Sequence, residues 1–485
     1  MYVRYQINMV SLAIINTWLL TMHGPGLGIV ENGTLAVENE TIVYAGPSDR
    51  FNPSNADSII DGTNHVTMPG LVNTHFHSGM TLLRGGAQDM PEIEWMNRGV
   101  GPLGAHVNHD DSLIGSKLAV VEGLRSGTTT FAEYGANVAR LVENVYQPFG
   151  VRVVATESIN EISSNRSHLK PSDLYEFDPL KGDAALKQAE ELFENFRGED
   201  LVSCMYGPQA LDMMSVELLT KIRDRAVFRG SKMHLHLAQG ERERLQIQGR
   251  YGADVSTVSL LRQHDLLGDF LIGAHCHDTD APERELMADA RVSMASCQSS
   301  ISMIDGIVPP LSHYVEELGG TAGLGTDQAP GPGNHNMFRE MRTASLLAKI
   351  THQDPTRLPA WKSLELATIA GARVLDLDDI IGSLEVGKRA DLITINLHHP
   401  NLSPTVSRPF RNFVPNLVYS ASGAEVDNVF INGRQVMAGG KLSFIDESSL
   451  LEDADERASL IFARAESDWR NAGSMLVRHV DHGHL

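Results

Sequence analysis

The chain contains few cysteines: Cys204, Cys276 and Cys297 are the only three among 485 residues. They lie far apart without CxxC spacing, so neither a disulfide framework nor a thiolate zinc site is expected. We therefore expect a reducing, cytoplasmic compartment. Basic residues are also in the minority, since 40 Lys and Arg stand against 61 Asp and Glu, a formal net charge of -21. An acidic surface repels nucleic acids and anionic membranes, so neither is expected as a partner.

Long apolar runs are missing as well. No stretch reaches the roughly 18 apolar residues that a transmembrane helix needs. The apolar residues 9–22 are interrupted by Asn16 and Thr17, and no small-residue cleavage pattern follows, so we interpret them as a buried β-strand and not as a signal peptide. With 42% hydrophobic and 21% charged residues, the composition is that of a globular enzyme with a sizeable core.

Between about residues 66 and 375, apolar strands alternate with amphipathic helices. Eight strands are predicted, ending near His77, Glu133, Glu157, Gln209, Gln239, Cys276, Gln298 and Asp327. Helical spacing of apolar residues is found at 112–125, 184–196, 216–229 and 337–350. Eight βα units predict an α/β fold of the (β/α)8 TIM-barrel type.

Shorter strands flank this region on both sides. They are predicted at 12–20, 33–37, 41–45, 391–397, 416–419 and 426–431, with turns at Gly387-Lys388 and Asn432-Gly433. We expect the two terminal segments to form one small β-sandwich domain. The predicted organisation is 1–67 and 381–449 for that domain, 68–380 for the barrel, and 450–485 for a C-terminal helix and tail.

Four of the predicted barrel strands end in residues that bind metal ions. The segments are 69–77 (PGLVNTHFH), 233–239 (MHLHLAQ), 272–276 (IGAHC) and 325–327 (GTD). Residues two apart in a strand point to the same face, so His75 and His77 can both reach one ion at the mouth of the barrel. His234 and His236 repeat this spacing; one of them is needed, and the spacing leaves open which.

The residue types indicate which ion would bind. Three nitrogens and one carboxylate favour one divalent ion of the Zn²⁺ type, with Fe²⁺ or Mn²⁺ as alternatives, over Mg²⁺ or Ca²⁺. Such an ion lowers the pKa of bound water to about 7, and Asp327 is the candidate that shuttles the proton. His275 is expected to polarise the substrate or hold the hydroxide, with a fifth-ligand role as the alternative. His277 is interpreted as a loop residue.

These segments resemble the amidohydrolase superfamily, in its branch of cytosine deaminases, S-adenosylhomocysteine deaminases and aminotriazine hydrolases. The resemblance covers nearly the whole chain and is carried by residues 69–77, 125–131 (RSGTTTF), 382–392 (GSLEVGKRADL) and 416–423 (NLVYSASG). It implies one metal ion held by His75, His77, His236 and Asp327, with His275 beside it. It also implies a small-molecule substrate and a homodimer or larger homo-oligomer.

The chain departs from this branch at positions that contact the substrate. Gln239 stands where deaminases of the branch carry a glutamate, and an amide donates a hydrogen bond but does not relay a proton. Gln209 and Ser296 stand where the branch often has histidines. Glu241 or Glu243 is a candidate replacement acid, although charged residues that open a helix are more simply surface residues.

The sequence thus predicts a metal-dependent hydrolase that cleaves a non-peptide C–N bond by attack of metal-bound hydroxide. Its catalytic residues are expected to be Asp327, His275 and Gln239. The reaction would be deamination or deamidation of an N-heterocycle or cyclic amidine, such as an aminotriazine, nucleobase or purine nucleoside. Because of Gln239, the alternative is a triazine, urea or carbamate hydrolase that expels a group other than ammonia. A third hypothesis, a binding barrel without catalysis, gives no physical reason for the complete ligand set.

Overall fold

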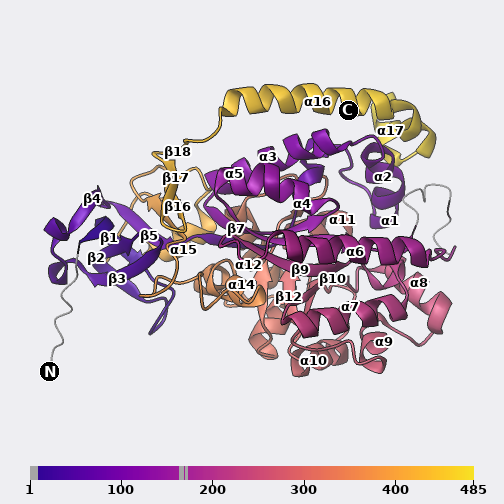
Figure 1. The fold of residues 1–485 in the computed structure, drawn as a ribbon, viewed down its shortest axis with the longest axis horizontal. Coiled ribbons are helices and arrows are strands. Elements are labelled where there is room, and N and C mark those ends of the chain that lie inside the picture. The colour runs from indigo at the N-terminus through magenta and orange to yellow at the C-terminus, as the bar shows by residue number, and fades with distance from the viewer. Residues whose placement is uncertain (1–8, 163–168, 170–172) are drawn as a thin grey trace.

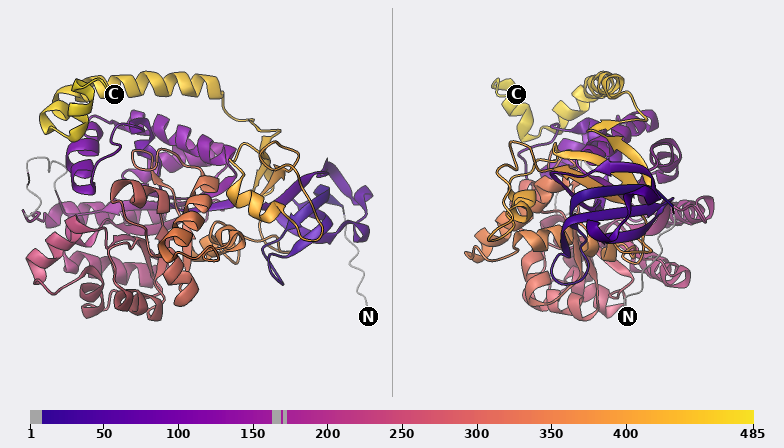
Figure 2. Two further views of the ribbon diagram at one scale, coloured as in Figure 1. Left: turned by 180° about the vertical axis from the view of Figure 1, so that it is seen from behind. Right: turned by 90° about the vertical axis from the view of Figure 1, so that its left-hand side faces the viewer.

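The computed structural model describes residues 9–162, 169 and 173–485, so the first eight residues of the expected N-terminal segment lie outside it. Two separate sheets organise the chain. The barrel lies at one end of the molecule, the N-terminal strands lie at the other, and the C-terminal strands lie between them (Figure 1 and Figure 2).

The first sheet is a closed barrel of parallel strands. Its members are β6 (Leu71–His77), β7 (Thr128–Gly135), β8 (Arg152–Ile159), β9 (Val202–Pro208), β10 (Met233–Leu237), β11 (Leu271–His275), β12 (Ser293–Ser296), β13 (Ala322–Leu324) and β14 (Asp327–Gln328). Strand β13 pairs with β12, and β14 pairs with β6, where Asp327 lies opposite Phe76. β13 and β14 are therefore two pieces of the eighth strand, and the predicted (β/α)8 barrel is confirmed.

The eighth strand is interrupted at Gly325 and Thr326, directly before Asp327. A Cβ on Gly325 would lie 2.8 Å from the backbone nitrogen of His75 and 3.0 Å from its carbonyl oxygen, so only glycine fits. Oδ1 of Asn73 accepts a hydrogen bond of 3.0 Å from the backbone N–H of Thr326. Because of this break, the eighth strand lies against β6, the first barrel strand, beside the histidines of β6.

The lower half of the barrel is filled and sealed by apolar side chains. One buried cluster joins inward residues of six strands to the segment 372–381: Val72, Ala132, Val154, Met205, Ile272, Ala295, Ala372, Val374, Leu375, Leu377 and Ile381. Because this end is plugged, the carboxyl ends of the strands form the accessible end of the barrel, where active sites of this fold lie.

The second sheet takes strands from both ends of the chain, as predicted. Its strands are β1 (Val10–Leu20), β2 (Ile29–Glu38), β3 (Thr41–Pro47), β4 (Ala56–Asp61), β5 (His65–Pro69), β15 (Leu392–Asn396), β16 (Val426–Ile431), β17 (Arg434–Ala438) and β18 (Lys441–Leu442). β15 pairs antiparallel with β5, which joins the two terminal segments. Asn432 and Gly433 have φ angles of 51° and 75°, as the tight β16–β17 hairpin requires.

Helices cover the outside of the barrel. They are α1 (Glu92–Glu94), α2 (Gly101–Gly104), α3 (His109–Arg125), α4 (Val138–Leu141), α5 (Gln147–Phe149), α6 (Pro179–Asn195), α7 (Val216–Arg229), α8 (Glu241–Tyr251), α9 (Thr257–Gln263), α10 (Ala281–Asp289), α11 (Gln298–Ile304), α12 (Met337–His352), α13 (Ala360–Leu366), α14 (Ile369–Val374), α15 (Phe413–Tyr419), α16 (Glu447–Ala472) and α17 (Met475–Asp481). None of those in the described part of the chain has the length and hydropathy required of a membrane span.

The helices differ from the sequence-based prediction in type at one place and in their bounds at others, such as the start of α6 at Pro179, five residues before the predicted one. Residues 416–419, predicted as a strand, belong to α15, because an apolar run of this length fits a buried helix equally well. Helix α3 begins at His109, three residues before the predicted start. There Oδ1 of Asn108 accepts from the N–H groups of Asp110 and Asp111, while the Asp111 carboxylate accepts from the N–H of Asn108.

Candidate active site

Four predicted ligand atoms converge at the carboxyl end of the barrel. Nε2 of His77 lies 3.1 Å from Nε2 of His75 and 3.3 Å from Nε2 of His236. Oδ1 of Asp327 lies 3.4 Å from Nε2 of His77 and 3.7 Å from Nε2 of His75. Strands β6, β10 and β14 therefore bring these side chains to one point, although they are up to 252 positions apart in the chain.

The second ring nitrogen of each of these histidines has a partner of its own. Nδ1 of His77 lies 2.6 Å from the carbonyl oxygen of Tyr134, and Nδ1 of His236 lies 2.8 Å from that of Gln209. A carbonyl only accepts, so both Nδ1 atoms carry the proton and leave Nε2 free to bind an ion. Nδ1 of His75 lies 2.9 Å from Nε2 of His234. This settles the order of the β10 pair, because His236 reaches the site and His234 lies deeper, behind His75.

Asp327 presents one carboxylate oxygen to the histidines and anchors the other. Oδ2 accepts a hydrogen bond of 2.5 Å from the Ser300 hydroxyl and one of 3.3 Å from the Gln328 amide. Burial raises the pKa of Asp327, while His77 and these hydrogen bonds lower it. The carboxylate is thereby held in one orientation with Oδ1 facing His75 and His77.

The electrostatic state of the site suits a cation. Burial lowers the pKa of His75, His77 and His236, and it lowers the pKa of His234 and His275 to about 3. All five imidazoles are therefore neutral at pH 7, the form that binds metal ions. Three neutral nitrogens and one carboxylate oxygen, with their orientations fixed by outer partners, fit a zinc-type ion.

His275 lies directly beside this cluster. Its ring centroid is 5.1 Å from that of His75 and 5.4 Å from that of His236, and its Nδ1 has no hydrogen-bond partner among the described residues. The backbone turns sharply here, with φ angles of 72° at His275 and 61° at Asp327. Such left-handed conformations are costly for non-glycine residues and concentrate at functional sites.

A cavity of about 770 Å³ opens above the cluster and includes His77, His236, His275 and Asp327 in its lining. Much of its wall is apolar; Met80, Leu83, Trp95, Met96, Val100, Leu141, Met213, Ile301 and Ile304 contribute to it. Leu83, Trp95 and Val100 also pack into a buried cluster with Ile461 of α16, so the C-terminal helix supports this wall from outside.

Gln239 lines the cavity, and its side-chain nitrogen is buried without a hydrogen-bond partner among the described residues. The candidate replacement acids do not take its place. Glu241 is exposed. Glu243 is buried, contrary to the prediction of a surface residue, and its carboxylate accepts from the backbone N–H of Gln239 at 2.8 Å and from the Thr257 hydroxyl at 2.7 Å. Glu243 thus fixes the loop that carries Gln239.

Gln209 and Ser296, the two other positions at which the chain departs from the deaminase branch, differ in their surroundings. Gln209 lines the cavity, and its Oε1 accepts a hydrogen bond of 2.7 Å from the Asn160 amide. Ser296 is fully buried, and its hydroxyl accepts from the Gln298 amide at 2.8 Å. Gln209 is therefore placed to contact a substrate, whereas Ser296 bonds within the protein.

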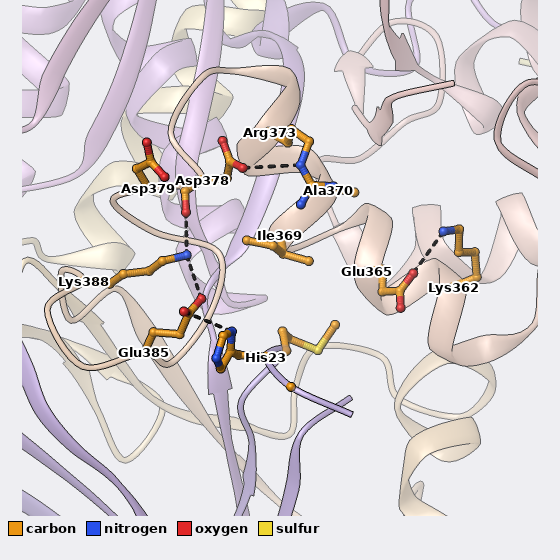
Figure 3. A pocket seen from close by; sticks show the side chains of 12 residues that line it. His23, Lys362, Glu365, Ile369, Ala370, Arg373, Asp378, Asp379, Glu385 and Lys388 are labelled. Carbon is orange, nitrogen blue, oxygen red and sulfur yellow. Dashed lines mark hydrogen bonds and ion pairs between the residues drawn. The ribbon is translucent and has the colours of Figure 1, made fainter. Parts of the chain in front are cut away.

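A second hollow, of about 500 Å³, lies where the end of β1 meets the loop before β15 (Figure 3). Its charged groups are paired with one another: His23 and Lys388 lie 3.0 and 3.1 Å from Glu385, and Arg373 lies 3.3 Å from Asp378. Paired charges of this kind stabilise a surface and leave little unsatisfied chemistry for a ligand. The cavity above His75 and Asp327 is therefore the candidate active site.

Comparison with known proteins agrees with this fold. The Amidohydrolase family profile matches residues 66–436. A 5'-deoxyadenosine deaminase of Methanosarcina acetivorans is 32% identical over 465 residues, which cover 95% of this chain and 100% of the relative. A 5-methylthioadenosine/S-adenosylhomocysteine deaminase of Desulforudis audaxviator is 35% identical over 438 residues, or 90% and 96% of the two chains.

A solved structure is similar over the same extent. An adenosine deaminase from Xanthomonas campestris with bound zinc has a TM-score of 0.85 and 28% identity, covering 94% of this chain and 99% of that one. The extent of these matches shows the family and the class of reaction. The chain belongs to the amidohydrolase family and is a hydrolase that acts on carbon–nitrogen bonds.

Proposed function

We propose that the protein is a zinc-dependent deaminase that removes an amino group from an electron-poor carbon of an N-heterocycle. The convergence of the His75, His77 and His236 nitrogens with the Asp327 carboxylate at the floor of the cavity carries this proposal. A cavity of about 770 Å³ is in the range used for small-molecule sites. The relatives named as deaminases of adenine compounds support ammonia as the leaving group.

In this proposal the protein groups have separate roles. His75, His77, His236 and Asp327 would hold the ion, which would supply a nucleophilic water at neutral pH. The Asp327 carboxylate would accept a proton from the attacking water and pass it to the departing amine. His275 contacts the reacting carbon's substituents from the side, and Gln239 donates a hydrogen bond to the heterocycle. Because an amide does not relay protons, all proton transfer is assigned to Asp327.

A second candidate is displacement of a leaving group other than ammonia. Gln239 favours it, because the nearby carboxylate of Glu243 bonds the backbone and Thr257, so that no second acid is supplied from this loop. A leaving group that departs without protonation would need no such acid. The two candidates differ in whether ammonia is formed in step with substrate loss.

The test measures ammonia and substrate loss with protein of known metal content. The panel contains 5'-deoxyadenosine, 5'-methylthioadenosine, adenosine, guanine, isocytosine and melamine. We expect chelator-sensitive ammonia release that zinc restores, and its loss in His236→Asn but not in the matched control His264→Asn, which alters an exposed histidine. Substrate loss without ammonia would select the second candidate. Full activity in the chelator-treated protein would contradict both.

A further inference from the structure

Three polar side chains, Gln239, His277 and Asp305, line the same cavity as the ligand cluster. The ring centroid of His277 is 6.4 Å from that of His275. Gly240, which follows Gln239 in the chain, lies against the other two residues, because a Cβ built on it would lie 3.2 Å from Nε2 of His277 and 3.4 Å from Oδ1 of Asp305.

His277 is buried and Gln239 and Asp305 are half-buried, and the Gln239 amide nitrogen has no hydrogen-bond partner among the described residues. The His277 side chain is 1% exposed, and neither of its ring nitrogens has a hydrogen-bond partner in the described ranges. Its closest charged neighbour is Oδ2 of Asp305 at 3.6 Å, beyond hydrogen-bonding distance, and the Asp305 side chain is 9% exposed. Buried polar groups without partners are costly, so a cluster of them facing a cavity indicates a ligand that supplies the partners.

The cluster is held rigidly and contains more acceptors than donors. Glu243 fixes the backbone N–H of Gln239 at 2.8 Å. Glu92, which also lines the cavity, accepts from Arg242 through Oε1 at 2.8 Å, while its Oε2 has no hydrogen-bond partner among residues 9–162, 169 and 173–485. The cavity wall therefore contains the unpartnered Oε2 of Glu92 and the Asp305 carboxylate as acceptors, and the Gln239 amide as a donor.

We infer that Gln239, His277 and Asp305 form a subsite that binds the lactam edge of the substrate by hydrogen bonds. This edge consists of a ring N–H beside a carbonyl group. The carbonyl accepts from the Gln239 amide or from the N–H of His277, and the ring N–H donates to Asp305. The base of an adenosine-type substrate, apart from its leaving amino group, offers only acceptor nitrogens and leaves Asp305 without a donor. The inference rests on the proposed function and narrows its substrate class to amino-oxo heterocycles of the isocytosine or guanine type.

Matched substrates test this subsite. Isocytosine and 2-aminopyrimidine carry the same leaving amino group, but the second lacks the lactam edge. We expect kcat/KM to be higher for isocytosine, and we expect Asp305→Asn to lower the ratio of the two values by about fivefold or more, because the amide oxygen still accepts but lacks the negative charge that strengthens the hydrogen bond. The control Asp468→Asn alters a surface aspartate that also pairs with a histidine, His106 at 2.8 Å, and should leave the ratio unchanged. An Asp305→Asn variant with the wild-type ratio would overturn the inference.

Product binding separates this inference from the proposed function. Uracil, which carries the lactam edge and needs no turnover to bind, is titrated into wild type and Asp305→Asn by calorimetry. Weaker binding of uracil to the variant supports the subsite even where no ammonia is released, in which case the proposed function alone fails. Equal binding of uracil to both proteins overturns the subsite even where ammonia is released.

Discussion

Replacing His234 by phenylalanine should weaken metal binding without disturbing the fold. His234 is fully buried, and its Nε2 lies 2.9 Å from Nδ1 of His75. For Nε2 of His75 to bind an ion, its Nδ1–H has to donate to His234, and a phenyl ring fills the space without accepting that bond. Losing such an outer hydrogen bond costs roughly 10- to 100-fold in metal affinity, about 1.4 to 2.8 kcal/mol.

The assay is zinc affinity, measured by competition with a chelator of known affinity. His234→Gln retains an acceptor in the same place and should lie between wild type and His234→Phe. His264→Phe places the same substitution at an exposed position and should leave zinc affinity unchanged. Thermal unfolding of the metal-free proteins checks that the barrel is intact. Wild-type zinc affinity in a folded His234→Phe protein would refute the reasoning that His234 orients His75.

Four further predictions concern single residues. Asp327→Asn should abolish turnover while the protein stays folded, because it removes a metal ligand and the proton acceptor together, and near-wild-type rates would contradict the assignment. Gln239→Glu should change the range of aminated rings that release ammonia, because a carboxyl group relays protons, and an unchanged range would mean that residue 239 does not contact the substrate. Burial raises the pKa of the Glu340 carboxyl group from 4.5 to about 7. The folded protein therefore binds this proton more tightly than the unfolded chain, which stabilises the fold by up to ~3 kcal/mol below pH 4.5. This stabilisation is lost as the pH rises through 7. Thermal unfolding at pH 4.5 and pH 8 should therefore differ less in Glu340→Gln than in wild type, and an equal difference would exclude this source. Asp391→Asn should lower the free energy of unfolding by about 3 to 5 kcal/mol, because Arg152, whose Nε lies 2.6 Å from Asp391 Oδ2, would stay buried without its partner, and a loss below 1 kcal/mol in denaturant titrations would contradict this.

Much of the barrel could be predicted because its signals are local. Helix α7 was predicted at its observed bounds, 216–229, since Ser215 caps its start and Gly230, at φ 64°, ends it. The error at 416–419 has the opposite cause. Three apolar residues after Asn416, without a repeat, do not distinguish a strand from a helix, and packing in the buried cluster around Phe413 and Leu417 decided it.

The candidate site likewise contains some residues that local sequence signals indicate and others that they do not. His75, His77 and Asp327 were predictable because each ends an apolar strand, and the ends of parallel barrel strands meet at one rim. The position of Glu243 was predicted less well, since charge beside a helix start suggests exposure, whereas the structure buries Glu243 under the β10 loop. His277 is a loop residue, as predicted, and the structure adds that its side chain is buried in the cavity wall.

The sequence by itself determined the βα alternation, the strand ends that carry metal-binding residues, and the departure at Gln239, because periodicity and residue type are properties of neighbouring positions. The family resemblance already implied His236 as a ligand, but only the tertiary structure showed that His234 supports His75 from behind. It alone placed Asp305 next to His277, because that contact joins the loop after β11 to the C-terminal end of α11. Such contacts depend on strand order, register and burial, which no local stretch of sequence contains.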